Sequence, residues 1–210
     1  WDKPYMITEW GPNGHWESPT TTWNVPIEQT STEKAASYRE RYDIIANDSI
    51  NCLGSYVFLW GQKQETSATW YGLFLADGKE TAVMDVLIEK WSGELPTNFA
   101  PNINFFKINN KTPYESLECN RKSILNIEIE VMDKDKDNLQ YQYSIVPEST
   151  DIKSGGDKEL APEPIWSETS TKPIDKINSP SRLGKYRLFL QVSDNHGNAA
   201  TANFPFHVIN

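Results

Sequence analysis

The 210-residue sequence has few cysteines, few basic residues and no long apolar run, and each shortage argues against a class of protein. The two cysteines, Cys52 and Cys119, fall in segments that we assign to different domains, so we expect no disulfide between them. No apolar run approaches the roughly 18 residues of a membrane span, so we expect no membrane partner. The sequence has 20 Lys and Arg residues and 29 Asp and Glu residues, and this excess of acidic residues argues against a nucleic-acid partner.

Motifs for metal and nucleophile chemistry are also missing. The histidines are not grouped with cysteines, so no zinc site is expected. No Ser-His-Asp order and no Gly-rich phosphate loop stands out. Asp133, Asp135 and Asp137 alternate as calcium ligands can, but the Gly and the terminal Glu of an EF-hand are absent and lysines lie between them. We therefore favour a solvated hairpin turn there, and we expect neither a metal nor a cofactor.

Aromatic residues, in contrast, are abundant. They make up 12% of the chain and include eight tryptophans. Such a composition suits a protein that stacks neutral sugars on its surface. It suits the core of a β-sandwich equally well, so composition leaves both interpretations open.

Three segments within residues 1–95 have the character of strands. Tyr5–Gly11 is short and apolar and leads into a Gly/Pro-rich loop. Gly54–Trp60 is apolar without interruption, which predicts a strand buried on both faces of a parallel sheet. Trp70–Leu75 is a candidate for a short extended segment before a turn.

Two helices are predicted between and after these strands. Thr30 and Glu33 form a capping-box pattern at the start of an apolar stripe that runs to Ile45. A second stripe begins near Val83, and Gly93 is a plausible stop. The order of strand, helix, strand and helix predicts two consecutive βα units.

Helical patterning ends at a Pro-containing linker over residues 96–100. Residues 101–210 then show short segments in which apolar and polar residues alternate, separated by turns rich in Asp, Asn and Gly. Such a pattern predicts an antiparallel β-sandwich. Lys153–Pro180 is polar and Pro-rich, and we expect a surface excursion around a strand near Ile165. The alternating segments are Ile124–Met132, Leu139–Ile145, Tyr186–Val192 and Asn203–Val208.

The N-terminal segments resemble a known family. Lys3–Gly11 looks like the seventh strand of the clan A glycoside hydrolases, which include family 2, and Gly54–Gly61 resembles their eighth strand. The resemblance implies the last two βα units of a (β/α)₈ barrel, in which active sites lie at the C-terminal ends of the strands. It implies that Glu9 is the catalytic nucleophile of a retaining enzyme and that Trp60 is the floor of the sugar subsite.

The same resemblance suggests further site residues. Trp10 follows the nucleophile position, where these enzymes usually have an aromatic residue. His15 and Trp16 lie in the next loop and Gln62 follows the eighth strand, so all three are candidates for binding sugar hydroxyls or stacking on a ring. Local packing of the loop is an equally good interpretation of His15 and Trp16.

The family's acid/base glutamate lies on its fourth strand, which this sequence does not contain. We therefore expect the C-terminal part of a retaining glycoside hydrolase that acts on an oligo- or polysaccharide, with the remaining barrel of the same protein as its partner. Residues 1–210 should be inactive alone, because one carboxylate cannot supply the two-carboxylate mechanism.

The C-terminal segments resemble a different group of domains. Asp133–Tyr143 and Gly184–Asn198 look like parts of immunoglobulin-like, cadherin-like and polycystic-kidney-disease-type modules of extracellular bacterial enzymes. The resemblance implies an immunoglobulin-like sandwich and a secreted or periplasmic location. It leaves open an alternative function, in which the chain is a non-catalytic module that binds a glycan or a protein.

Overall fold

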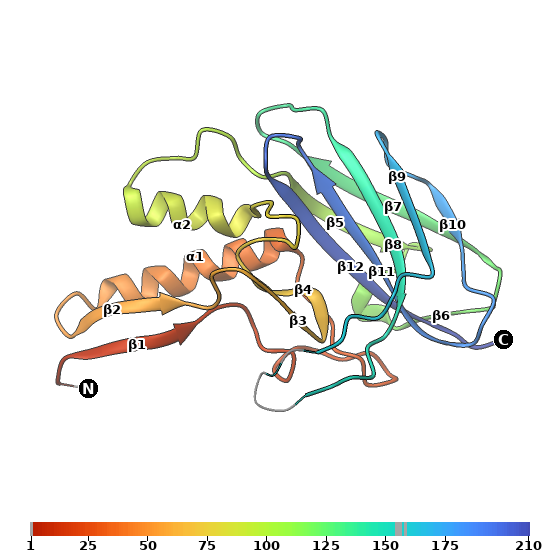
Figure 1. Ribbon diagram of the computed structural model, residues 1–210, viewed down its shortest axis with the longest axis horizontal. Coiled ribbons are helices and arrows are strands. Elements are labelled where there is room, and N and C mark those ends of the chain that lie inside the picture. Colours follow the sequence, from red (N-terminus) through yellow and green to blue (C-terminus); the bar gives the residue numbers. More distant parts are fainter. Residues whose placement is uncertain (1, 154–156, 158) are drawn as a thin grey trace.

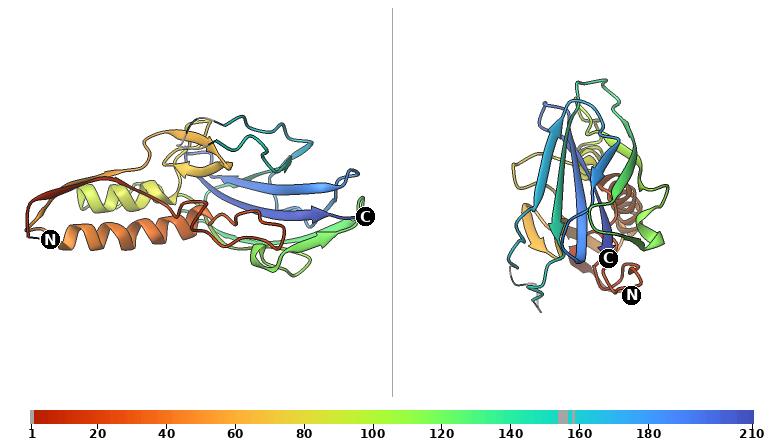
Figure 2. Two further views of the ribbon diagram at one scale, coloured as in Figure 1. Left: turned by 90° about the horizontal axis from the view of Figure 1, so that it is seen from below. Right: turned by 90° about the vertical axis from the view of Figure 1, so that its right-hand side faces the viewer.

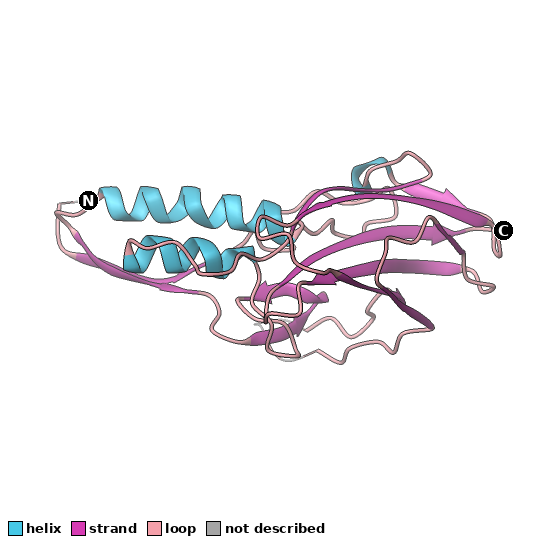
Figure 3. Ribbon diagram, turned by 90° about the horizontal axis from the view of Figure 1, so that it is seen from above, coloured by secondary structure: helices cyan, strands magenta, loops and turns pink. Residues whose placement is uncertain are grey.

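The computed structural model describes residues 2–153, 157 and 159–210. Both α-helices lie at one end of an elongated molecule and most of the strands lie at the other (Figures 1 and 3). The helical end is built from the N-terminal part of the chain, and the strand-rich end from the C-terminal part (Figure 2). The described residues form several open sheets and no closed barrel.

The N-terminal part begins with the predicted strand and helix. Strand β1 (Tyr5–Trp10) pairs in parallel with β2 (Cys52–Val57), so that Ile7 lies opposite Ser55. Helix α1 (Ser31–Asn47) connects the two strands. A parallel pair requires such a crossover, because a tight turn can join only antiparallel strands.

Both helices begin or end where the sequence predicts. In the capping box of α1, the backbone N–H of Glu33 donates to the Thr30 hydroxyl (3.1 Å), and the N–H of Thr30 donates to the Glu33 carboxylate (2.7 Å). Helix α2 (Ala82–Ser92) ends at Gly93, which has a φ of 77°. Glycine adopts this left-handed conformation without the steric cost that a side chain would add.

A β-hairpin that the sequence analysis did not predict lies between β2 and α2. Strands β3 (Gln62–Glu65) and β4 (Ser67–Gly72) are joined by Thr66 alone, whose φ is 62°. The sequence predicted only an extended segment over Trp70–Leu75. The hairpin carries no Asn-Gly or Asp-Gly signal, and a non-glycine residue at positive φ is uncommon, so local sequence gave no sign of this turn.

The β1–β2 sheet is covered on one face only. Helices α1 and α2 cover that face around a core that includes Trp10 and Leu87. On the other face Leu53 is exposed, and 61% of Tyr56 is accessible to solvent. The prediction that the second strand is buried on both faces is therefore wrong. Strand β2 is apolar, as the sequence shows, but among the described residues nothing packs on its second face. Val57 is only half-buried.

The C-terminal part consists of two sheets that pack face to face. One has the strand order β10–β7–β5, and the other has the order β6–β12–β11–β8–β9. The predicted alternating segments correspond to β7, β8, β11 and β12. The strands are β5 (Asn102–Ile108), β6 (Leu117–Cys119), β7 (Ile124–Met132), β8 (Gln140–Pro147), β9 (Trp166–Ser170), β10 (Lys176–Asn178), β11 (Gly184–Ser193) and β12 (Ala199–Val208), with a 3-10 turn at Pro113–Glu115.

The inward side chains of both sheets form one core. Phe106 of β5 meets Phe204 of β12 edge to face, with ring centroids 6.0 Å apart. Leu125, Tyr143 and Leu188 are fully buried in the same cluster. Nearly all pairings are antiparallel, as expected, but the short edge strand β6 runs parallel to β12.

The polar excursion over residues 153–180 contains β9 near the predicted position and also β10. Residues 154–156 and 158 of this excursion lie outside the described part of the chain. Strand β9 pairs with β8, and β10 pairs with β7, so each forms one edge of its sheet.

Buried polar contacts join the two parts. The Glu28 carboxylate accepts hydrogen bonds from Lys34 of α1 (2.6 Å), Ser67 of β4 (2.5 Å) and Asn203 of β12 (2.6 Å). Burial alone would raise the pKa of Glu28, but the charge and hydrogen bond of Lys34, the hydrogen bond of Ser67 and the charge of Arg187 hold it below its usual range. An ionised carboxylate with three donors is the arrangement that makes a buried charge tolerable.

Candidate functional site

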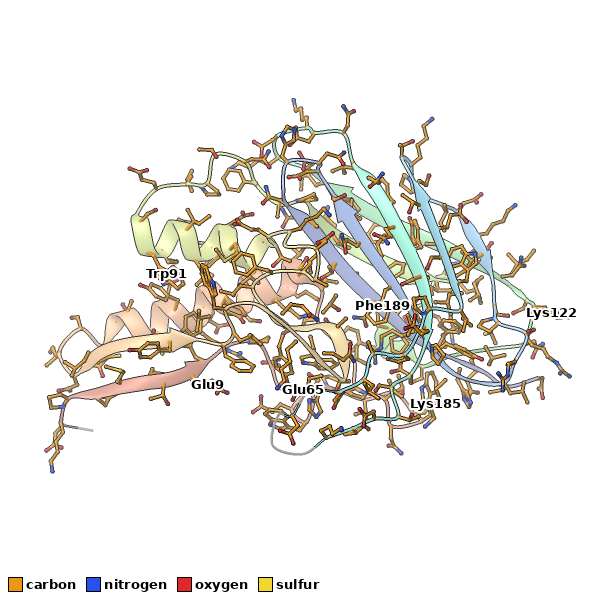
Figure 4. All side chains as sticks on the ribbon, in the orientation of Figure 1. Glu9, Glu65, Trp91, Lys122, Lys185 and Phe189 are labelled. Carbon is orange, nitrogen blue, oxygen red and sulfur yellow. The ribbon has the colours of Figure 1, made fainter. Side chains whose placement is uncertain are left out.

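Glu9 lies near the C-terminal end of β1, and its side chain is exposed. Figure 4 shows it below the helices, at the end of the strand. The loop that follows is held firmly: Gly11 approaches β2 so closely that an added Cβ would lie 2.7 Å from the Phe58 carbonyl oxygen. Arg41 of α1 donates to the carbonyl of Gly11 and to the side chain of Asn13. The carboxylate therefore sits on a rigid strand end, as a catalytic group requires.

Trp10 does not join Glu9. It is only 9% exposed and packs in the helix-covered core, with its ring 5.4 Å from that of Tyr38. A register irregularity in β1 between Ile7 and Trp10 interrupts the alternation of side chains, so that Ile7 and Trp10 both face the helices while Thr8 and Glu9 are exposed. The structure thus gives Trp10 a packing position and corrects its expected place beside a sugar.

His15 is the centre of a polar cluster in the loop after β1. Its backbone N–H donates to the Tyr71 hydroxyl (3.2 Å), and its ring Nδ1 lies 3.4 Å from that hydroxyl and 3.7 Å from the Glu65 carboxylate. Glu65 also pairs with Lys63 at 2.6 Å. Burial raises the pKa of Tyr71 to about 12, and Glu65 and Glu17 add to the effect, so its hydroxyl keeps its proton at neutral pH.

Lys63, Glu65 and Tyr71 were not among the predicted site residues. Lys63 and Glu65 lie on β3 and Tyr71 lies on β4, so the hairpin brings them together. Only the pairing of these strands places the three side chains beside His15. The nearest sequence signal is their position just after the second parallel strand, where loops line the mouth of a barrel.

Two of the predicted aromatic site residues, Trp16 and Trp60, are exposed. Trp16 is 71% exposed and meets the His15 ring edge to face at 4.9 Å. Trp60 is 69% exposed and packs its edge against Phe74 at 5.0 Å. Trp70, by contrast, is buried and donates its indole N–H to the Asn13 carbonyl (2.9 Å), which gives it a packing role. Two flat apolar surfaces are therefore open to solvent, and that of Trp16 lies beside His15.

Gln62 is engaged within the hairpin. Its side-chain amide donates to the Ala68 carbonyl across the β3–β4 turn (2.9 Å). Its amide oxygen is the group that it could offer to a ligand. Figure 4 labels two carboxylates on this side of the molecule, Glu9 and Glu65. Glu65 forms an ion pair with Lys63.

Asp133, Asp135 and Asp137 place carboxylate oxygens within 4.8 Å of one another, which is close enough for a metal ion. Protein donors already reach several of these oxygens, although Asp133 Oδ2 is buried without a hydrogen-bond partner among the described residues. The Asn98 side chain donates to Asp137 (2.8 Å), and the N–H of Phe99 donates to Asp135 (2.7 Å). The cluster therefore fastens the segment between α2 and β5 to the β7–β8 turn.

No family model matches this sequence, and no curated protein matches it. Among solved structures, the soluble domain of PmoD from Methylocystis sp. (Rockwell) is similar to part of the chain. It has 15% sequence identity and a TM-score of 0.27, and the match covers 55% of this chain and 95% of that one. A likeness of this degree carries no argument about function. No helix in the described part of the chain is both long and apolar enough to cross a membrane.

Proposed function

We propose that this chain is the C-terminal part of a secreted or periplasmic retaining glycoside hydrolase, with Glu9 as its nucleophile. In this proposal β1 and β2 are the seventh and eighth strands of a (β/α)₈ barrel. The observation that carries it is the position of Glu9: an exposed carboxylate near the C-terminal end of a parallel strand, followed by a loop that is fixed at Gly11 and by Arg41. Catalytic groups of barrel enzymes occupy this position.

Two further features support the proposal. The bare face of β1–β2 exposes Leu53 and Tyr56, as expected if further strands and their contents normally cover it. Trp16 and Trp60 offer exposed aromatic faces, which suit the apolar face of a sugar ring. A retaining enzyme also needs an acid/base carboxylate about 5–5.5 Å from the nucleophile. In this proposal another part of the parent protein supplies it, because Glu65 is tied to Lys63.

The test uses the longest natural polypeptide that contains residues 1–210, assayed on a panel of aryl glycosides. Glu9→Gln should lower turnover by several orders of magnitude, because it removes the covalent step. Glu40→Gln is the control, since Glu40 is an exposed glutamate on α1, outside the loop after β1, and it should leave turnover nearly unchanged.

Chemical rescue makes the assignment sharper. Azide added to a Glu9→Gly variant should restore consumption of an activated aryl glycoside and yield a glycosyl azide of inverted configuration. An azide product of retained configuration would assign Glu9 to acid/base catalysis instead. Glycosidase activity that survives Glu9→Gln would overturn the proposal.

A non-catalytic binding module is the second candidate, and a groove of about 1090 Å³ beside the sandwich favours it. Residues 1–210 would then bind a glycan or a protein, and no extended polypeptide that contains them would cleave a glycoside.

A further inference from the structure

The same groove has walls from both parts of the molecule. His15 lines one end, together with Thr66 at the tip of the β3–β4 hairpin. The opposite wall is formed by the end of β8, by Trp166 of β9 and by Tyr186 of β11. Ligand pockets typically occupy about 300–1,000 Å³, so the groove can accept a ligand longer than one sugar unit.

Strong contacts fix the walls of the groove in place. The buried Arg187 guanidinium donates to the Pro26 carbonyl (2.9 Å) and pairs with Glu148 of the opposite wall (3.0 Å). Lys185 donates to the Trp23 carbonyl (2.9 Å), which fastens the loop before α1 to β11. A site whose walls are already ordered loses little conformational entropy when a ligand binds.

The lining combines apolar surface with charges of both signs. Trp166 is half-buried, and Ile165 and Leu183 expose apolar side chains. Glu148 and Glu168 line the same groove as Lys176, Arg182 and Lys185, so the positive charges exceed the negative ones by only one. A polyanion or a phosphate would require a larger excess of positive charge. Flat apolar groups with scattered hydrogen-bonding side chains suit a neutral sugar chain, which has both hydroxyls and apolar ring faces.

His15 belongs both to this groove and to the polar cluster in the loop after β1. Its ring contacts Tyr71 and Glu65 in the cluster after β1, and it also lines the groove. We propose that the groove binds a neutral oligosaccharide segment of the substrate, so that the sandwich forms distal subsites of the enzyme. The link to catalysis rests on the proposed function, but the binding itself does not.

The test is a titration of the ¹⁵N-labelled 210-residue chain, followed through backbone and tryptophan indole N–H signals. The probes are cellohexaose, laminarihexaose, mannohexaose and xylohexaose, with hexagalacturonate as an acidic comparison and hexa-alanine as a peptide. At least one neutral hexaose should shift the Trp166 indole signal with a millimolar or lower dissociation constant. Hexagalacturonate should bind at least fivefold more weakly than that hexaose.

Variants assign the binding to the groove. Trp166→Ala should weaken binding at least fivefold, and Leu183→Asp, at an exposed lining position, provides a second disruption if Trp166→Ala does not fold. Trp91→Ala is the matched control, because this exposed tryptophan lies on α2, far from Lys185 in Figure 4, and it should leave affinity unchanged. The inference is wrong if no neutral hexaose shifts these signals at millimolar concentration, if only the peptide or the acidic sugar binds, or if both groove variants bind normally.

The two proposals can fail separately. Glu9→Gln should bind the hexaose as the unaltered chain does. If the hexaose binds through Trp166 but the extended polypeptide does not cleave glycosides, the proposed enzymatic function is wrong and the proposed binding groove stands. If turnover depends on Glu9 but Trp166→Ala leaves the KM for polysaccharide unchanged, the proposed role of the groove is wrong and the proposed enzymatic function stands.

Discussion

The β1–β2 sheet and the paired sheets around β11 differ in how many of their faces are covered. Between the paired sheets Tyr143 and Phe204 are completely buried. In the β1–β2 sheet the helices bury one face. Leu53 and Tyr56, on the opposite face, are exposed to solvent. Apolar burial stabilises a fold by about 25 cal/mol per Å² removed from water, so a bare face contributes little. The stability of residues 1–210 should therefore depend mainly on the paired sheets, and the bare face is surface that a partner can use.

The largest expected difference in the free energy of unfolding is between replacing a buried aromatic residue of the paired sheets and replacing an exposed one of the β1–β2 sheet. Phe204→Ala should destabilise the chain by about 4 kcal/mol, because it leaves a cavity in the closed core. Tyr56→Ala should change the free energy of unfolding by no more than about 0.5 kcal/mol. Urea unfolding of both variants measures the contrast. Equal losses would show that the second face of β1–β2 is covered in solution.

A smaller loss is expected at the junction between the two parts. Glu28→Ala leaves Lys34 buried without its carboxylate and should cost about 3 kcal/mol at neutral pH. The pKa of Glu28 is lowered in the folded state, so its contribution is present above the unfolded value of 4.5 and is lost as pH falls through the folded value. Urea unfolding against pH should therefore show the gap from the unaltered chain closing in acid. Glu40→Ala, at an exposed position of α1, should show neither effect.

Asp85 should show the opposite dependence on pH. Burial raises its pKa from 3.8 to about 6, with Glu80, Asp135 and Asp194 adding to the effect. Its contribution to stability is therefore fully present below pH 3.8 and is lost as pH rises through about 6. Asp85→Asn should stabilise the chain by about 2 kcal/mol at pH 7 and by almost nothing near pH 4. Asp43→Asn, on the exposed side of α1, is the control, and a gain of the same size there would contradict the explanation.

The smallest effect is expected at the start of α1, the helix that covers β1–β2. Thr30→Ala removes the side-chain acceptor of the capping box and should cost about 1 kcal/mol. Thr30→Ser keeps the hydroxyl and should be close to neutral. Thermal unfolding of the two variants separates the hydrogen bond from other effects of the substitution, and equal losses would argue against the cap.

Elements with a strong periodic pattern were predictable from sequence. The capping box located α1, Gly93 located the end of α2, and period-two alternation located β7 and β12. Strand β5 was not predicted, because a bulge between Ile103 and Phe105 interrupts its alternation. Elements of three residues, such as β6 and β10, are too short to carry a pattern.

The candidate site was predictable only in part. Glu9, Trp16 and Trp60 lie on the surface, where a ligand can reach them, but Trp10 is turned into the core. The position of Glu65 and Tyr71 beside His15 depends on hairpin pairing around Thr66. Contacts between residues about fifty positions apart are set by tertiary packing, which local patterns do not encode.

The contact between Glu28 and Asn203 also has a consequence for the timing of synthesis. The two residues are 175 positions apart, and Asn203 belongs to the strand that pairs with β11 and β6. At about 5–20 residues per second, a ribosome needs roughly 10 to 35 s to reach Asn203 after adding Glu28. Throughout that interval the carboxylate lacks one of its donors, and α1 lacks the strand against which its first turn packs. The N-terminal part of the nascent chain is therefore open to chaperones until β12 has been translated.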